Sequence, residues 1–218
     1  MDALLHCFGP NGRWRQPAER HWVAALLLLL SPVSLGGLRA QVVVPSPEAQ
    51  IAAALLPLPE ALRAGAGVRG YTPSLTPIML REGSNTMVCT GDLPGDDRFD
   101  VRCYDREFLR VIDRSRELRR AGLEGTTADR RLNQEIEEGI LHLPDHPTAG
   151  YRMLGPIQDF DPETNVAAPC IEKWQSIHFP YRTAEELGLP TTPEGTLPYV
   201  MSSGSWWSHV MIEHEPRR

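Results

Sequence analysis

The sequence lacks the short motifs that identify several common classes of enzyme and metal site. It contains neither an HExxH motif nor a paired CxxC motif, and the histidines and cysteines show no other metal-ligand spacing. A Walker phosphate-binding loop and a GxSxG nucleophile elbow are also missing, so neither a P-loop nucleotide-binding protein nor an α/β-hydrolase is indicated. We therefore predict no metal ion and no cofactor for this chain.

Lysine is almost absent, and the chain carries a negative net charge. Lys173 is the only lysine, and the formal net charge is −6. Residues 1–40 hold four arginines and two acids, so the remainder has 18 basic and 26 acidic side chains, a net charge of −8. Binding to a phosphate backbone needs a basic surface, so the composition argues against a nucleic-acid partner.

The first 40 residues have the order of a secretory signal. Arginines precede an unbroken apolar run over residues 22–30, and small residues and an imperfect cleavage sequence follow before Gln41. The run is short for a bilayer span, although an uncleaved anchor over residues 22–38 is the alternative and would be the only contact with a membrane. We predict a signal peptide over residues 1–40 and a mature protein in the periplasm or outside the cell.

Two parts are expected after the signal. Residues 41–74 are rich in Ala and Pro and suggest two short helices, which we interpret as a helical arm or linker. Residues 75–214 are expected to form one α+β domain. Its sheet is predicted to be small and mainly antiparallel, with two or three helices.

Changes in the period of apolar residues place the elements of that domain. Apolar residues recur at helical spacing over 105–122 and 127–139, and a capping-box sequence at Thr183–Glu186 starts a short helix. The spans with strand character are residues 78–80, 86–90, 99–103, 151–154, 174–179, 199–201 and 207–212.

Two cysteines are expected to pair across a hairpin. A turn at residues 92–97 separates the strand that contains Cys89 from the strand that contains Cys103, and pairing these two positions puts both thiols on the inner face. An exported protein meets oxidising surroundings, so we predict a Cys89–Cys103 disulfide. The alternative is that these two and Cys170, the third cysteine of the mature chain, are all small buried thiols.

The candidate ligand site comes from the alternation of side chains on two strands. Trp174 and His178 share one strand face, and Trp207 and His209 share another. If these strands are neighbours, the four side chains line one concave surface of the kind that binds small ligands. The alternative is a packed core in which Trp and His find hydrogen bonds.

Two other patterns resemble functional motifs but are better explained as ordinary local structure. Residues 159–165 place oxygen-bearing side chains at alternate positions but lack the Gly and Glu of an EF-hand, which favours a polar turn. Residues 65–70 have the spelling of a dinucleotide-binding loop, but the strand and helix that should flank it are not predicted.

Two segments carry a resemblance. Residues 81–89 (REGSNTMVC) and 207–212 (WSHVMI) resemble a pattern in uncharacterised exported bacterial proteins, over roughly residues 60–212. The resemblance implies no catalytic role. It implies only that Asn85, Cys89 and His209 are worth mutating first, and we add Asn85 to the candidate ligand-binding residues.

The expected function is binding of a small molecule or an envelope protein partner. One alternative is a hydrolase-like enzyme of unrecognised type that uses Cys170 or a histidine as its reactive group. A second alternative is a structural protein of the cell envelope.

Overall fold

The computed structural model describes residues 42–212, and the predicted signal peptide and the tail from residue 213 lie outside the described residues. The helices are α1(Pro47–Ala54), α2(Glu60–Arg63), α3(Arg106–Arg120), α4(Gly125–Glu137), the 3-10 helix η2(Ile157–Asp159) and α5(Ala184–Leu187). The strands are β1(Gly67–Tyr71), β2(Pro77–Arg81), β3(Met87–Thr90), β4(Arg98–Asp105), β5(Thr148–Pro156), β6(Phe160–Asp161), β7(Val166–Ala167), β8(Glu172–His178), β9(Tyr199–Met201) and β10(His209–Ile212). No helix in residues 42–212 has the length and apolar character needed to cross a bilayer.

The fold is α+β, but its main sheet is larger than predicted and is not purely antiparallel. Eight strands follow the order β2-β1-β3-β4-β5-β8-β10-β9. Strands β1 and β3 run parallel, and the other pairs run antiparallel. The expectation of a small, mainly antiparallel sheet was therefore wrong in size and in this one pairing.

The missing element in that expectation was β1, which overlaps the glycine-rich segment 65–70. Strand β1 lies so close to other chain segments that a side chain on Gly70 would force its neighbours to move. A Cβ on Gly70 would lie 2.4 Å from Gln50 Oε1 and 2.4 Å from Leu80 Cδ1. Glycine normally weakens a strand, so a sequence reading takes such a segment for a loop when it cannot see the close approach.

The segment predicted as an arm or linker is part of the folded domain. Helix α1 packs on the sheet, and Ala54, Leu58 and Val68 are buried in one apolar cluster with the two hairpin cysteines. Gln50 fastens α1 to β1, because its Nε2 donates to Tyr71 O at 3.0 Å and its Oε1 accepts from Tyr71 N at 2.8 Å. Among the described residues, β1 pairs with both β2 and β3, so residues 42–74 are continuous with the rest of the fold.

The predicted hairpin and disulfide are present. Cys89 lies opposite Cys103 in the β3–β4 register, and the two form a disulfide that is fully buried. Both sulfur atoms face α1, on the side of the sheet away from α3.

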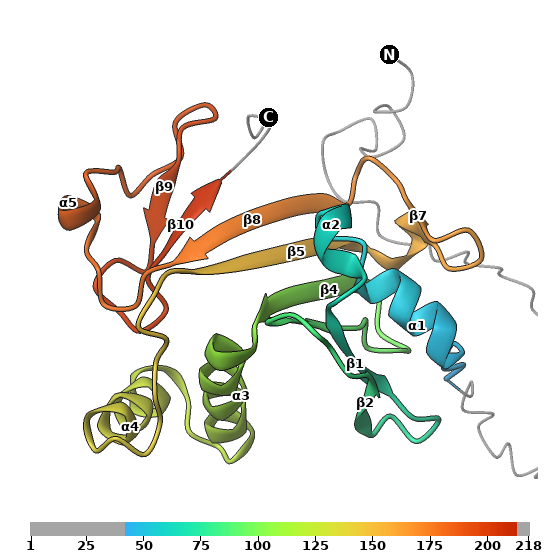
Figure 1. Ribbon diagram of the computed structural model, residues 1–218, viewed down its shortest axis with the longest axis horizontal. Coiled ribbons are helices and arrows are strands. Elements are labelled where there is room, and N and C mark those ends of the chain that lie inside the picture. The colour runs from blue at the N-terminus through green and yellow to red at the C-terminus, as the bar shows by residue number, and fades with distance from the viewer. Residues whose placement is uncertain (1–41, 213–218) are drawn as a thin grey trace, which may run out of the picture.

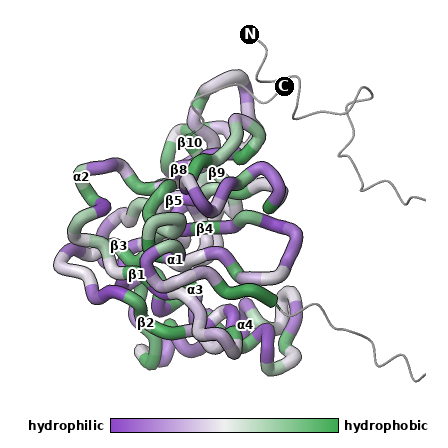
Figure 2. Tube along the Cα trace, turned by 90° about the vertical axis from the view of Figure 1, so that its right-hand side faces the viewer, coloured by the Kyte–Doolittle hydropathy of each residue, from purple (hydrophilic) through white to green (hydrophobic). Residues whose placement is uncertain are grey.

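Helices α3 and α4 lie together on the other side of the sheet (Figure 1). Phe108 and Leu109 of α3 and Leu132 of α4 belong to one buried cluster with Val88 and Trp206. In the sheet, β5 and β8 lie between β4 and the β9–β10 hairpin, and the hairpin and the two helices lie on opposite sides of these strands (Figure 1). In the perpendicular view β10, β8, β5 and β4 follow one another down the molecule, with α4 at the bottom (Figure 2). This arrangement leaves a stretch of sheet face between the helices and the hairpin.

Candidate functional site

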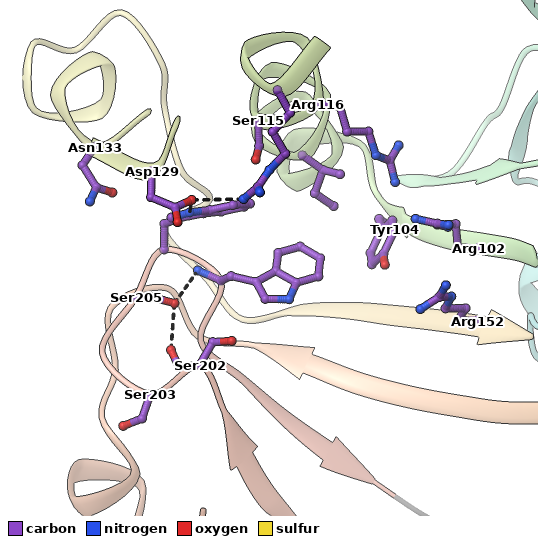
Figure 3. A pocket seen from close by; sticks show the side chains of 14 residues that line it. Arg102, Tyr104, Ser115, Arg116, Asp129, Asn133, Arg152, Ser202, Ser203 and Ser205 are labelled. Atoms are coloured by element: carbon purple, nitrogen blue, oxygen red, sulfur yellow. Dashed lines mark hydrogen bonds and ion pairs between the residues drawn. The ribbon is translucent and has the colours of Figure 1, made fainter. Parts of the chain in front are cut away.

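That open sheet face is hollowed into a cleft with two adjoining cavities. The smaller has a volume of about 220 Å³, and its lining includes Gly150, Trp174, Ser176, His178, Trp207 and His209. The larger has a volume of about 600 Å³ and lies between β4 and β5, helices α3 and α4, and the segment 202–207 (Figure 3). Tyr104, Arg152 and Trp207 line both, so the two cavities form one cleft.

Four of the five predicted ligand-binding residues come together in the smaller cavity. Strands β8 and β10 are neighbours, and His178 lies directly opposite His209 in their antiparallel register. The centroid of the His178 ring lies 5.0 Å from the centroid of the His209 ring and 4.7 Å from that of the Trp207 ring. Trp174, four residues before His178, lies on the same face of β8 and completes the set.

Asn85, the fifth predicted residue, lies elsewhere. Its Nδ2 donates to Leu62 O at 2.9 Å, and its Oδ1 accepts from Met87 N at 3.0 Å. It therefore ties the end of α2 to the start of β3 and lines neither cavity.

Burial favours the neutral form of both histidines. Burial, and to a smaller extent the neighbouring His209, lower the pKa of His178 from 6.5 to about 3. Burial also lowers the pKa of His209, although its contact with the Trp207 carbonyl acts in the opposite direction. In the neutral ring His209 Nδ1 donates to Trp207 O at 2.6 Å, which leaves Nε2 as the acceptor.

His178 makes one polar contact and leaves one ring nitrogen without a partner. Its Nε2 lies 3.1 Å from Ser176 Oγ. Its Nδ1 is buried and has no hydrogen-bond partner among the described residues, and the same is true of Oγ1 of Thr148, its register partner on β5. Buried polar atoms are normally satisfied, so these two atoms are exceptions beside the smaller cavity, which His178 lines and Thr148 does not.

A glycine forms the floor of the smaller cavity. A Cβ on Gly150 would lie 2.6 Å from Ser176 Oγ and 2.9 Å from His178 Nε2. The absence of a side chain at this position lets the Ser176–His178 contact form and keeps the cavity open.

The arginines of the cleft were missed by sequence reasoning. Arg102 of β4 faces Arg152 of β5 in the strand register, and Arg116 approaches from α3 (Figure 3). The alternation of residues in β4 placed Asp100 and Arg102 on the strand face opposite Cys103. Charged residues on that face predict only that it is exposed to solvent. Only the packing of α3 turns that face into the wall of a cleft.

The other sequence-level candidates do not form a second site. No cysteine in the described part of the chain is free, and Cys170 lines neither cavity. Within residues 42–212 no three His, Cys, Asp or Glu side chains are grouped to hold a metal ion. The segment 159–165 is a polar turn, in which Asp161 accepts hydrogen bonds from Glu163 N at 2.9 Å and Thr164 Oγ1 at 2.6 Å.

No family model, curated protein or solved structure matches this chain, so its function is inferred from the site itself.

Proposed function

We propose that this chain is an exported small-molecule-binding protein whose ligand occupies the cleft between the sheet, helices α3 and α4, and segment 202–207. The observation that carries the proposal is the convergence of Trp174, His178, Trp207 and His209 on one cavity that opens into a larger one. Trp174 and His178 lie on β8, His209 lies on β10, and Trp207 lies in the segment that leads into β10, so they meet only in the folded protein.

The size and lining of the cleft support a small ligand. Small-molecule sites are concave, measure a few hundred cubic ångströms or more, and combine aromatic walls with a few convergent polar groups. Here Tyr104 and Trp207 form the aromatic wall between the two cavities. Ser176, His178 and His209 supply polar groups that can orient a ligand at one end.

The contact between Ser176 and His178 raises the question of hydrolysis, but its chemistry is unfavourable. A serine hydrolase needs an imidazole that accepts the serine proton and a third group that orients the imidazole. A histidine with a pKa of about 3 is a poor base near neutral pH, and its Nδ1 has no orienting partner among the described residues. Binding accounts for the site better than catalysis.

Native mass spectrometry of protein isolated from its own cell envelope tests the proposal directly. We expect a species of discrete added mass that is lost on denaturation. Trp174→Leu should lower its occupancy about tenfold, whereas Tyr71→Leu, an aromatic replacement on β1 outside both cavities, should leave it unchanged. Ligand binding would be contradicted by two results together: a native mass equal to that of the polypeptide alone, and a melting temperature that no compound in a broad metabolite library changes.

A further inference from the structure

Positive charge gathers at the end of the larger cavity where Tyr104 lies. Figure 3 shows the guanidinium groups of Arg102, Arg116 and Arg152 at this end. The whole chain has a formal net charge of −6, so this is a local reversal of sign.

One carboxylate serves both Arg102 and Arg152. Arg152 donates from Nε and Nη2 to the two oxygens of Asp100 at 2.9 and 2.8 Å, and Arg102 contacts the same carboxylate. Burial alone would raise the pKa of Asp100, but the hydrogen bonds and charges of Arg152 and Arg102 outweigh it and lower the pKa. Arg152 is held further by Trp174, whose ring centroid lies 5.2 Å from its guanidinium carbon. These contacts fix both guanidinium groups and leave one net positive charge.

A second carboxylate, that of Asp113, is likewise shared by two arginines and again leaves one net positive charge. Asp113 pairs with Arg69 and lies 3.5 Å from Arg116 Nη1. That is the only polar contact of Arg116 within the described residues, and it exceeds hydrogen-bond length. Burial lowers the pKa of Arg116, and the charge of Arg102 lowers it further. The two arrangements together hold four guanidinium groups against two carboxylates.

Three uncharged groups of the lining can donate a hydrogen bond to a ligand. The Tyr104 hydroxyl, the Trp207 Nε1–H and the Ser115 hydroxyl make no hydrogen bond to any residue in 42–212. Asp129, the one acid in the lining, already accepts at Oδ1 from Trp206 Nε1 at 3.2 Å and from Arg119 Nη2 at 3.3 Å. A ligand with acceptor atoms would satisfy the free donors, and the arginines favour acceptors that carry negative charge.

We propose that the cleft takes an organic acid: the oxygens of a carboxylate or phosphate monoester bind Arg116 with Arg102 and Arg152, and an apolar body lies against Tyr104 and Trp207. This inference rests on the proposed function and narrows it to one class of ligand. A neutral ligand would leave the fork of Arg116 unpaired in a half-buried site, whereas an acid pairs with it in two parallel hydrogen bonds.

Matched pairs of probes, each an acid and a neutral analogue with the same apolar group, show how much the acidic group contributes to binding. Isothermal titration of the full chain should compare 1-naphthoate with 1-naphthamide, 1-naphthyl phosphate with 1-naphthol, and octanoate with octanamide. At least one acid should bind ten times more tightly than its neutral partner, and its affinity should fall as salt rises. The carboxylate and phosphate arms show which acid the site prefers. Inorganic phosphate alone should bind more weakly than the preferred acid, because it lacks the apolar body.

Two variants of α3 then test whether the acidic group of the ligand binds at Arg116. Arg116→Gln should weaken binding of the preferred acid at least tenfold and leave the affinity for its neutral partner within twofold. Arg110→Gln removes the same charge from an exposed position of α3 that lines neither cavity, and should change neither affinity by more than twofold. The acid and neutral comparison on the unaltered chain does not depend on any variant folding correctly.

The results distinguish this inference from the proposed function. Neutral probes that bind as well as the acids, or acid binding that Arg116→Gln leaves intact, would overturn the organic-acid assignment while small-molecule binding stands. If no acid binds but native mass spectrometry shows a retained neutral ligand, the organic-acid assignment again fails alone. If no probe binds and no ligand is retained, both proposals fail.

Discussion

At the scale of single residues, Gly150 controls the floor of the cleft. In Gly150→Ala the added methyl group would meet Ser176 Oγ at 2.6 Å and His178 Nε2 at 2.9 Å, so these side chains must move. We expect a loss of about 1–3 kcal/mol in the free energy of unfolding, as for other overpacked positions, measured by urea denaturation. The control is Gly91→Ala, where the nearest atom to the new Cβ is Arg69 O at 3.4 Å, and there the change should stay below about 0.5 kcal/mol. Equal effects of the two substitutions would mean that the floor is not tightly packed.

The buried histidine should make stability depend on pH. The pKa of His178 is about 3 in the folded protein and near 6.5 when unfolded, so between these values the unfolded chain binds the extra proton. Its contribution is complete above pH 6.5 and is lost as the pH falls, at about 1.4 kcal/mol per pH unit. His209, with its pKa also lowered by burial, acts in the same direction.

Asp92 opposes this trend, so the test must compare variants. Burial raises the pKa of Asp92 from 3.8 to about 6, and a carboxyl with a raised pKa adds stability as the pH falls from about 6 to 4. Unfolding free energies at pH 6.0 and 5.0 should therefore be measured for the unaltered chain and for His178→Gln. The unaltered chain should lose about 1 kcal/mol more over this step than the variant does. The same loss in both would show that His178 titrates normally.

At the scale of elements, the β3–β4 hairpin is closed by the disulfide between residues 14 apart in sequence. Closing a loop of this length restricts the unfolded chain and contributes about 3 kcal/mol in the chain-entropy model. Reduction with a phosphine should lower the unfolding free energy in urea by about that amount. The double variant Cys89→Ala, Cys103→Ala should start at the lower stability and respond much less to reductant. A reduced protein as stable as the oxidised one would contradict this contribution.

Helices α3 and α4 are joined by an ion pair whose carboxylate is buried. Arg114 donates to both oxygens of Glu135 at 2.7 Å, and the Glu135 side chain is only 3% exposed. We expect Glu135→Gln to cost about 2 kcal/mol in unfolding free energy, since hydrogen bonds between charged groups are lost. Glu117→Gln is the matched control, because Glu117 contacts the same arginine but is 59% exposed, and its effect should be below about 0.5 kcal/mol. Two equally small effects would show that the pair contributes little.

The elements that sequence patterns predicted were those with a regular apolar period. Helices α3 and α4 and strands β3, β4, β8 and β10 were placed within a few residues of their observed bounds. Residue parity also put Trp174 and His178 on one face and paired Cys89 with Cys103, because side-chain direction in a strand follows from the backbone alone. What the sequence did not reveal depends on long-range packing. Strand β1 needed the close approach of Gln50 and Leu80 to Gly70, and Arg116 joins the cleft only because α3 packs on the sheet.

At the scale of the whole molecule, the large sheet makes the cleft possible. In the eight-stranded sheet, β5 and β8 lie between β4 and the β9–β10 hairpin, and the cleft lies on this part of the sheet face, with α3 and α4 on one side and the segment 202–207 on the other. The histidines lie on β8 and β10, and the arginines on β4, β5 and α3. The two ends of the cleft therefore come from different parts of the chain, which explains why no single motif in the sequence marks the site.

Export is the remaining property of the whole chain that can be tested. A charged leader, the apolar run at residues 22–30 and small residues before Gln41 predict cleavage near residue 40, and the buried Cys89–Cys103 disulfide suits an oxidising compartment. When the full sequence is expressed in a bacterial host, the mature protein should appear in the periplasm or medium. Intact mass spectrometry should show that it has lost about 40 residues and that the hairpin cysteines are oxidised.

Replacing Leu26 and Leu28 by Arg should trap the full-length chain in the cytosol, because a charged segment no longer serves as the apolar core of a signal. Full-length chain with reduced hairpin thiols in the cytosol of the unaltered strain would contradict export.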